Sequence, residues 1–63
     1  MTLQAFLEMY DNWNGQTKVN NNNLEMITQM CTMDLYDNRK DLLDCMVVAF
    51  GFYDEIMTVR LAI

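Results

Sequence analysis

The side chains in this sequence that could carry chemistry are two cysteines, Cys31 and Cys45, and nine acidic residues, and there is no histidine. A cysteine becomes a useful nucleophile only beside a base or a cation that stabilises its thiolate. Without histidine no Cys–His pair can form, and the spacing of the cysteines matches no zinc pattern. Free cysteines are most often small buried apolar residues. We therefore expect that the protein is not an enzyme and has no metal, no cofactor and no catalytic residue.

The segment at residues 11–15, DNWNG, has a partial likeness to a calcium-binding loop. Such a loop needs Asp or Asn at its third position and a bidentate Glu at its twelfth. Trp13 and Asn22 occupy these positions here, so two ligands are missing. We interpret the segment as a turn after a helix, because Asn and Gly tolerate the left-handed conformation that ends a helix.

Each of the three tyrosines is followed directly by an aspartate. The favoured explanation is turn chemistry: an amphipathic tyrosine ends an element at the core edge, and the aspartate begins a turn. A second explanation is an exposed group of tyrosines, carboxylates and one tryptophan that binds an Arg- or Lys-rich protein surface. The candidate partner-binding residues are Tyr10, Asp11, Trp13, Tyr36, Asp37, Tyr53 and Asp54.

Apolar spacing predicts a helix at the N-terminus. Leu3, Phe6, Leu7 and Tyr10 recur at intervals that place them on one helical face. Thr2 can cap this helix by accepting a hydrogen bond from a free N–H of the first turn.

The last third of the sequence predicts a β-hairpin, with strands at residues 45–53 and 56–63. A turn at Asp54 and Glu55 sets a register that separates two faces. One face is wholly apolar and pairs Phe52 with Met57, Phe50 with Val59, Val48 with Leu61, and Met46 with Ile63. The other face pairs Tyr53 with Ile56, Gly51 with Thr58, Ala49 with Arg60, and Val47 with Ala62. Asp-Glu is not a favoured two-residue turn, so a wider loop or a bulge is the alternative.

The middle of the sequence gives a weaker pattern. Residues 16–20 suit a short strand, and the asparagines that follow indicate a turn. Residues 24–33 fit either a helical face or strand alternation, and we favour the strand. Residues 32–36 are expected to be extended, and Asp37 is expected to cap a short helical turn over residues 38–43.

These elements predict a single α+β domain over residues 1–63, with one N-terminal helix packed on a three- or four-stranded antiparallel sheet that ends in the C-terminal hairpin. The net charge is −5. A nucleic-acid-binding protein needs a cationic surface, so direct nucleic-acid binding is not expected. No apolar run approaches the ~20 residues that span a bilayer, and no signal peptide is recognised, so we expect a cytoplasmic protein without a membrane segment.

Three stretches carry a resemblance to known sequences: residues 6–13 (FLEMYDNW), 37–42 (DNRKDL) and 47–54 (VVAFGFYD). They resemble small uncharacterised proteins carried by phages, plasmids and integrative elements of Gram-positive gut bacteria. The resemblance implies a cytosolic accessory protein of a mobile element, and it transfers no catalytic or binding residue.

The leading hypothesis is a small acidic protein-binding accessory module of a mobile genetic element. Its partner is another protein or a second copy of the chain, because an apolar strand ending in Leu61, Ala62 and Ile63 can pair as a sheet edge. The alternative is an anti-defence inhibitor of the anti-CRISPR kind, which presents carboxylates to a basic nucleic-acid-binding surface.

Overall fold

A computed structural model describes all 63 residues. It contains three helices and four strands: α1 (Leu3–Met9), β1 (Gln16–Asn20), β2 (Met26–Cys31), α2 (Thr32–Asn38), α3 (Lys40–Leu43), β3 (Val47–Tyr53) and β4 (Ile56–Leu61). The strands form one sheet in the order β2-β1-β4-β3.

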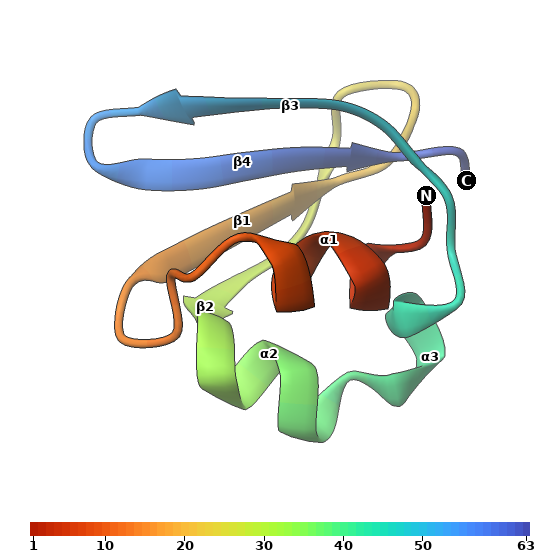
Figure 1. The fold of residues 1–63 in the computed structure, drawn as a ribbon. Helices are drawn as coiled ribbons and strands as arrows, with labels where there is room; N and C mark the ends of the chain where they lie inside the picture. The colour runs from red at the N-terminus through yellow and green to blue at the C-terminus, as the bar shows by residue number, and fades with distance from the viewer.

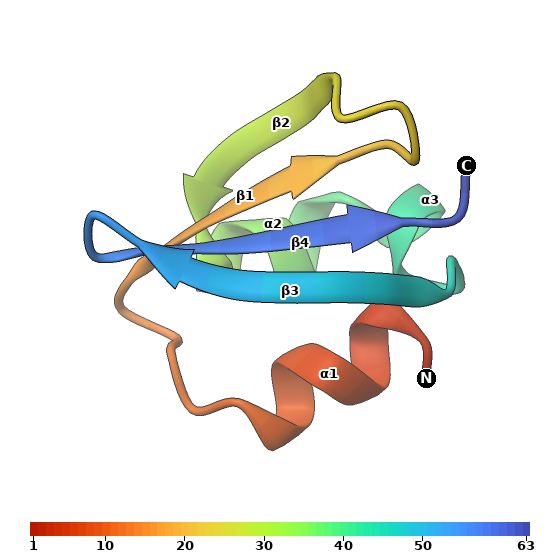
Figure 2. The ribbon, with the colours of Figure 1, turned by 90° about the horizontal axis from the view of Figure 1, so that it is seen from above.

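The molecule has two layers, with the sheet above and all three helices below it (Figure 1). The upper face of the sheet, here called the open face, has no helix on it (Figure 2). The predicted α+β class, the N-terminal helix and the C-terminal hairpin are confirmed. The layer below the sheet was predicted to contain one helix, but it contains three, because α2 and α3 lie beside α1.

The sheet is mixed, which corrects the prediction of a wholly antiparallel sheet. β1 pairs with β2 and β3 with β4 in antiparallel fashion, but β1 pairs with β4 in parallel, with Val19 opposite Val59. Parallel neighbours need a long connection, because a tight turn joins only antiparallel strands. The chain from β2 through α2, α3 and β3 supplies that length and places β4 between β1 and β3.

The structure resolves the ambiguous middle segment as a strand, β2, as favoured from the sequence. The expected extended segment at residues 32–36 was wrong, because α2 forms there. This helix buries Leu35 in the core, and the Thr32 hydroxyl donates to the Gly15 carbonyl at 3.2 Å. A helical turn follows as α3, but Asp37 lies inside α2 and does not cap it.

The hairpin register is confirmed over its first five pairs, from Tyr53 opposite Ile56 to Ala49 opposite Arg60. Asp54 and Glu55 form the two-residue turn with φ angles of 51° and 64°, so the wider loop is absent. Beyond Ala49 the register shifts by a bulge, and Val47 pairs with Leu61. The predicted pairing of Val48 with Leu61 and the pairs beyond it were therefore wrong, and the bulge turns Val47 onto the core instead.

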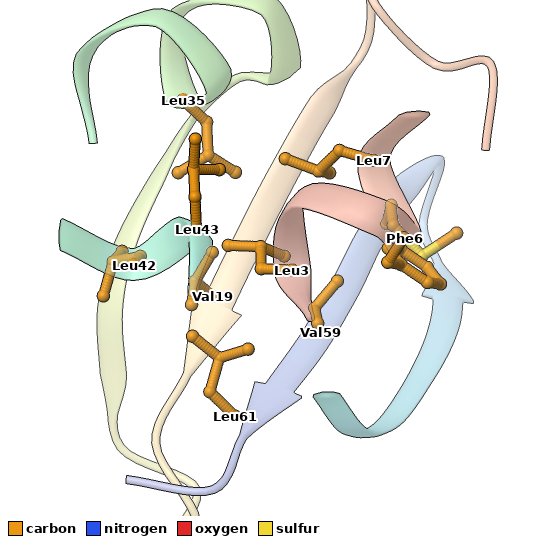
Figure 3. Close-up of a cluster of buried hydrophobic side chains, with 10 residues drawn as sticks. Leu3, Phe6, Leu7, Val19, Leu35, Leu42, Leu43, Val59 and Leu61 are labelled. Carbon is orange, nitrogen blue, oxygen red and sulfur yellow. The ribbon is translucent and has the colours of Figure 1, made fainter. Parts of the chain in front are cut away.

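The core lies between the sheet and the three helices (Figure 3). The Thr2 hydroxyl accepts a hydrogen bond from the Ala5 N–H, as predicted, and starts α1. The buried apolar residues are Leu3, Phe6, Leu7, Val19, Leu35, Leu42, Leu43, Met57, Val59 and Leu61. β3 contributes none of them, although its sequence is apolar throughout. The helical layer thus covers β1 and β4 and leaves β3 uncovered.

The edges of the sheet are β2 and β3. The C-terminal strand β4 is an interior strand, which contradicts the expectation that Leu61, Ala62 and Ile63 form a pairing edge. Any pairing with a further strand must therefore use β2 or β3. None of the helices is long and apolar enough to cross a membrane.

Candidate interaction surface

An aromatic cluster joins the ends of α1 and α2. The Trp13 and Tyr36 rings meet edge to face with centroids 5.2 Å apart. The Tyr36 hydroxyl donates a hydrogen bond to the Glu8 carboxylate. The Lys40 ammonium lies 5.2 Å from the Tyr36 ring centroid and donates to the Tyr36 carbonyl at 3.0 Å. These contacts join α2 to α1 through Glu8, to the following loop through Trp13 and to α3 through Lys40, which is a structural role.

The hydrogen bond between Tyr36 and Glu8 shifts both titrations. It lowers the pKa of Glu8, and a bond from Gln4 lowers that pKa further. The same bond raises the pKa of Tyr36, because loss of the phenolic proton would place two negative oxygens together. In α3, the hydrogen bond from Arg39 lowers the pKa of Asp41, and the pair is the single salt bridge of the chain.

The seven predicted partner-binding residues do not form one surface. Trp13 and Tyr36 contact each other. Tyr10 instead stacks on Phe6, with the two ring centroids 6.0 Å apart, and Tyr53 lies over Gly51 on β3. The side chains of Asp11, Asp37 and Asp54 are exposed and make no hydrogen bond. The structure therefore leaves their role in partner binding a prediction.

Several exposed apolar side chains lie along β3. Phe50 is 63% exposed and Phe52 is 54% exposed, although both lie on the same side of the sheet as the buried Val59 and Met57. Val48 and the preceding Met46 are about half exposed as well. Phe6 reaches this strand from below, with its ring centroid 4.9 Å from that of Phe50. Soluble domains rarely leave such a contiguous surface exposed unless it binds something.

A groove of about 380 Å³ runs between β3 and α1 and is lined only by apolar residues. We call it the β3–α1 groove, and its residues are Met1, Phe6, Met9, Val47, Val48, Ala49 and Phe50. Figure 2 shows why it is open: α1 lies to the outer side of β3, and no other strand lies on that side of β3. Met9 on α1 is 65% exposed at this groove.

The charges are segregated. All nine acidic side chains are exposed, and none lies in a strand. Lys18 and Arg60 are the only charged residues of the four strands, and both lie on the open face. Neither α1 nor β3 contains Lys or Arg, and the acidic residues Asp44, Asp54 and Glu55 flank β3 in the sequence.

A smaller hollow of about 240 Å³ lies on the open face. Asn20 and Arg60 stand opposite each other there, and the Asn20 side-chain oxygen and the Arg60 Nε are buried without a partner in the protein. The hollow is below the ~300 Å³ of ordinary ligand pockets. The β3–α1 groove is therefore the stronger candidate for a functional surface.

Sequence reasoning missed Phe50 and Phe52 as surface residues because it assigned the apolar face of the hairpin to the core, and it gave Met9 no role. One signal in the sequence could have indicated their exposure. The sequence predicted a single helix, and one helix is too small to cover the apolar faces of four strands. The two cysteines were expected to be free and buried; they are free, but each is only half-buried. The Cys31 Sγ lies 3.4 Å from the Trp13 carbonyl oxygen.

No family model, curated protein or solved structure matches this chain. Its functional assignment therefore depends on the geometry described above.

Proposed function

We propose that this chain is a small protein-binding module without catalysis, and that the β3–α1 groove with the adjoining edge of β3 is its binding surface. The observation that carries the proposal is the exposure of Phe50 and Phe52 on a strand that no helix covers. Half-exposed aromatic residues beside an apolar groove are typical of the residues that dominate protein-binding energies. The accessory role in a mobile element is part of the proposal and is supported by the resemblance of the three sequence stretches.

Variants on the two edge strands test the proposal. Phe50→Lys and Phe52→Lys place a charge on the proposed surface, whereas Met26→Lys changes an equally exposed apolar residue on the opposite edge, β2. The tagged wild-type chain and the three variants are used to capture proteins from a Gram-positive bacterial extract. Each captured protein is then purified and titrated calorimetrically.

The expected result is a partner that binds the wild type and Met26→Lys and that loses at least about tenfold in affinity with either phenylalanine variant, since hot-spot truncations cost about 2 kcal/mol or more. Equal binding to all four chains would contradict the proposal, as would the absence of any partner that depends on Phe50 or Phe52.

A second candidate is the anti-defence inhibitor, which is favoured by the exposure of every carboxylate. The chain and a variant with Asp34, Asp37 and Asp44 changed to Asn are expressed in a host with an active defence system, and phage plaques are counted. Protection of the phage by the wild type alone would support this candidate. Unchanged plaque counts with both chains would count against it.

A further inference from the structure

We infer that the β3–α1 groove receives an extended segment of a partner protein, which adds to the free edge of β3 as a fifth strand of the sheet. The inference rests on the proposed protein-binding function and specifies its geometry. The available edge runs over residues 48–53, which corresponds to a segment of about six residues, or ~20 Å at ~3.3 Å per residue.

The backbone of β3 offers hydrogen bonds along this edge. In the ladder with β4, alternate residues direct their N–H and C=O groups toward β4 or away from it. The two-residue turn makes Tyr53 and Ile56 a pair bonded to each other, so Phe52 and Phe50 occupy the positions that point outward. Their two N–H and two C=O groups form the template that strand-adding ligands use.

The chain itself shows this mode of pairing at the end of the edge. The Val47 N–H donates outward to the Met1 carbonyl at 2.8 Å, and Thr2 forms an antiparallel bridge with Met46. The bridge is antiparallel, so Leu3 and the helix lie toward Cys45, and Met1 lies on the side of the free edge. A partner segment would continue the same line along β3 from Met1 onward.

The surroundings of the edge define the chemistry of the segment. Its downward side chains would meet Phe6, Met9, Val48 and Phe50 in the groove, so they are apolar. Its upward side chains would stand in solvent beside Tyr53, so they are polar. Apolar residues at every second position are therefore expected.

Charge complementarity adds a second requirement. Asp44 precedes β3, and Asp54 and Glu55 follow it, whereas neither α1 nor β3 contains Lys or Arg. The segment is therefore expected to carry Lys or Arg at its ends, because such charges meet acidic groups and avoid like-charge repulsion.

A second folded copy fits this edge poorly. Two antiparallel β3 strands would be related by a twofold axis perpendicular to the sheet, which places both helical layers on the same side. Because α1 projects beyond β3, the α1 helix of each copy would enter the space below the other's β3 (Figure 2). A single extended segment has no such layer and fits above α1.

The test begins with a phage library of random nine-residue peptides selected on the wild-type chain. Selected peptides are synthesised and titrated against the wild type, Phe50→Lys, Phe52→Lys and Met26→Lys, each checked for folding by circular dichroism. If Phe50→Lys unfolds through loss of its contact with Phe6, Phe52→Lys keeps the test valid, because Phe52 makes no aromatic contact. The expected peptides alternate apolar and polar residues between basic ends, and bind Met26→Lys as they bind the wild type.

Backbone N-methylation then separates strand addition from simple filling of the groove. Methylation removes the N–H donor and leaves the side chains, so methylating the residue that bonds β3 is expected to weaken binding at least about tenfold, and methylating its neighbour much less. Equal effects at both positions, with binding still dependent on Phe52, would overturn strand addition and leave the proposed function intact. Failure to select any peptide that depends on the phenylalanines would contradict both.

Light scattering tests whether a second copy of the chain occupies the edge of β3. The free chain is expected to keep the 7.5 kDa mass of one copy at high concentration. A doubled mass that Phe52→Lys reduces to one copy would show that the edge is occupied by a second chain and would overturn the inference.

Discussion

The two edge strands of the sheet differ in how far the helices below them cover their apolar side chains. β2 is an edge strand that leads directly into α2, and Ile27 and Met30 pack against the core that α2 helps to form. β3 is the other edge, where Phe50 and Phe52 remain more than half exposed although Phe6 contacts Phe50. Exposed apolar side chains also lie at and beside the β2 edge, where Leu24 and Met26 are exposed. Only β3 combines two exposed phenylalanines with an adjoining apolar groove, which is why we assign binding to that edge.

The largest difference is expected in stability. Leu35→Ala removes a fully buried side chain under the β2 half and is expected to cost about 2–5 kcal/mol, much of the stability of so small a domain. Phe52→Ala removes a larger side chain at the β3 edge and is expected to cost about 1 kcal/mol or less, because the side chain is half exposed. Urea unfolding followed by circular dichroism measures both. Equal losses would show that the β3 edge is packed as well as the rest.

A buried hydroxyl pair also belongs to the β2 half. The Thr17 and Thr32 hydroxyl oxygens lie 2.6 Å apart and link β1 to α2. Thr32→Val leaves the Thr17 hydroxyl buried without this partner and is expected to cost about 1–3 kcal/mol. The double variant with Thr17→Val is expected to recover part of this loss in thermal unfolding, since no unpaired hydroxyl remains. A double variant less stable than the sum of the single changes would contradict the pairing.

At the β3 edge the turn stores backbone strain. Glu55 has a φ of 64°, in the left-handed region that glycine adopts without cost. Glu55→Gly is expected to stabilise the domain by about 0.5–1 kcal/mol in urea unfolding. Asp44→Gly is the matched control, because Asp44 has an ordinary φ of −86° and should lose stability on the same change. A destabilised Glu55→Gly chain would argue against the two-residue turn.

The smallest effect concerns the contact that holds α1 against α2. Because Tyr36 lowers the pKa of Glu8, the ionised carboxylate is favoured in the folded state. The resulting stabilisation is present above the pKa of Glu8 in the unfolded chain and is lost as the pH falls through the lower pKa of the folded state. An NMR titration should show Glu8 titrating below its ordinary pKa, and Tyr36→Phe should raise that pKa. Unchanged titration in Tyr36→Phe would contradict the contact.

Local patterns predicted the elements that local physics determines. The cap at Thr2, the apolar stripe of α1 and five pairs of the hairpin follow from side-chain spacing and turn position. The strand β2 also followed from alternation, although a helix fitted almost as well. α2 was missed because Thr32 and Leu35 are held by Gly15 and by the core, which are tertiary contacts that no local window contains.

The exposure of β3 could not be predicted, because it depends on the order of the strands in the sheet. The alternation of the hairpin distinguishes its two faces, but it does not reveal whether helices cover the apolar one. The insertion of β4 between β1 and β3 places Val59 in the core and Phe50, its partner across the ladder, at an edge. The candidate residues of the Tyr-Asp pairs were chosen by residue type, and one pair, Tyr36 and Asp37, lies inside α2 and not at a turn. The groove could be recognised only from the placement of α1 beside β3.

Amide hydrogen exchange gives the most direct test of the central claim that the outer edge of β3 is a free binding edge. In the free chain the amides of Phe50 and Phe52 are expected to exchange quickly and those of the interior strand β4 slowly, because only the former lack a strand beside them. Saturation with a selected peptide is expected to slow exchange at Phe50 and Phe52 by at least about tenfold, as new backbone hydrogen bonds form. Unchanged exchange at both amides in a peptide-bound chain would contradict the account.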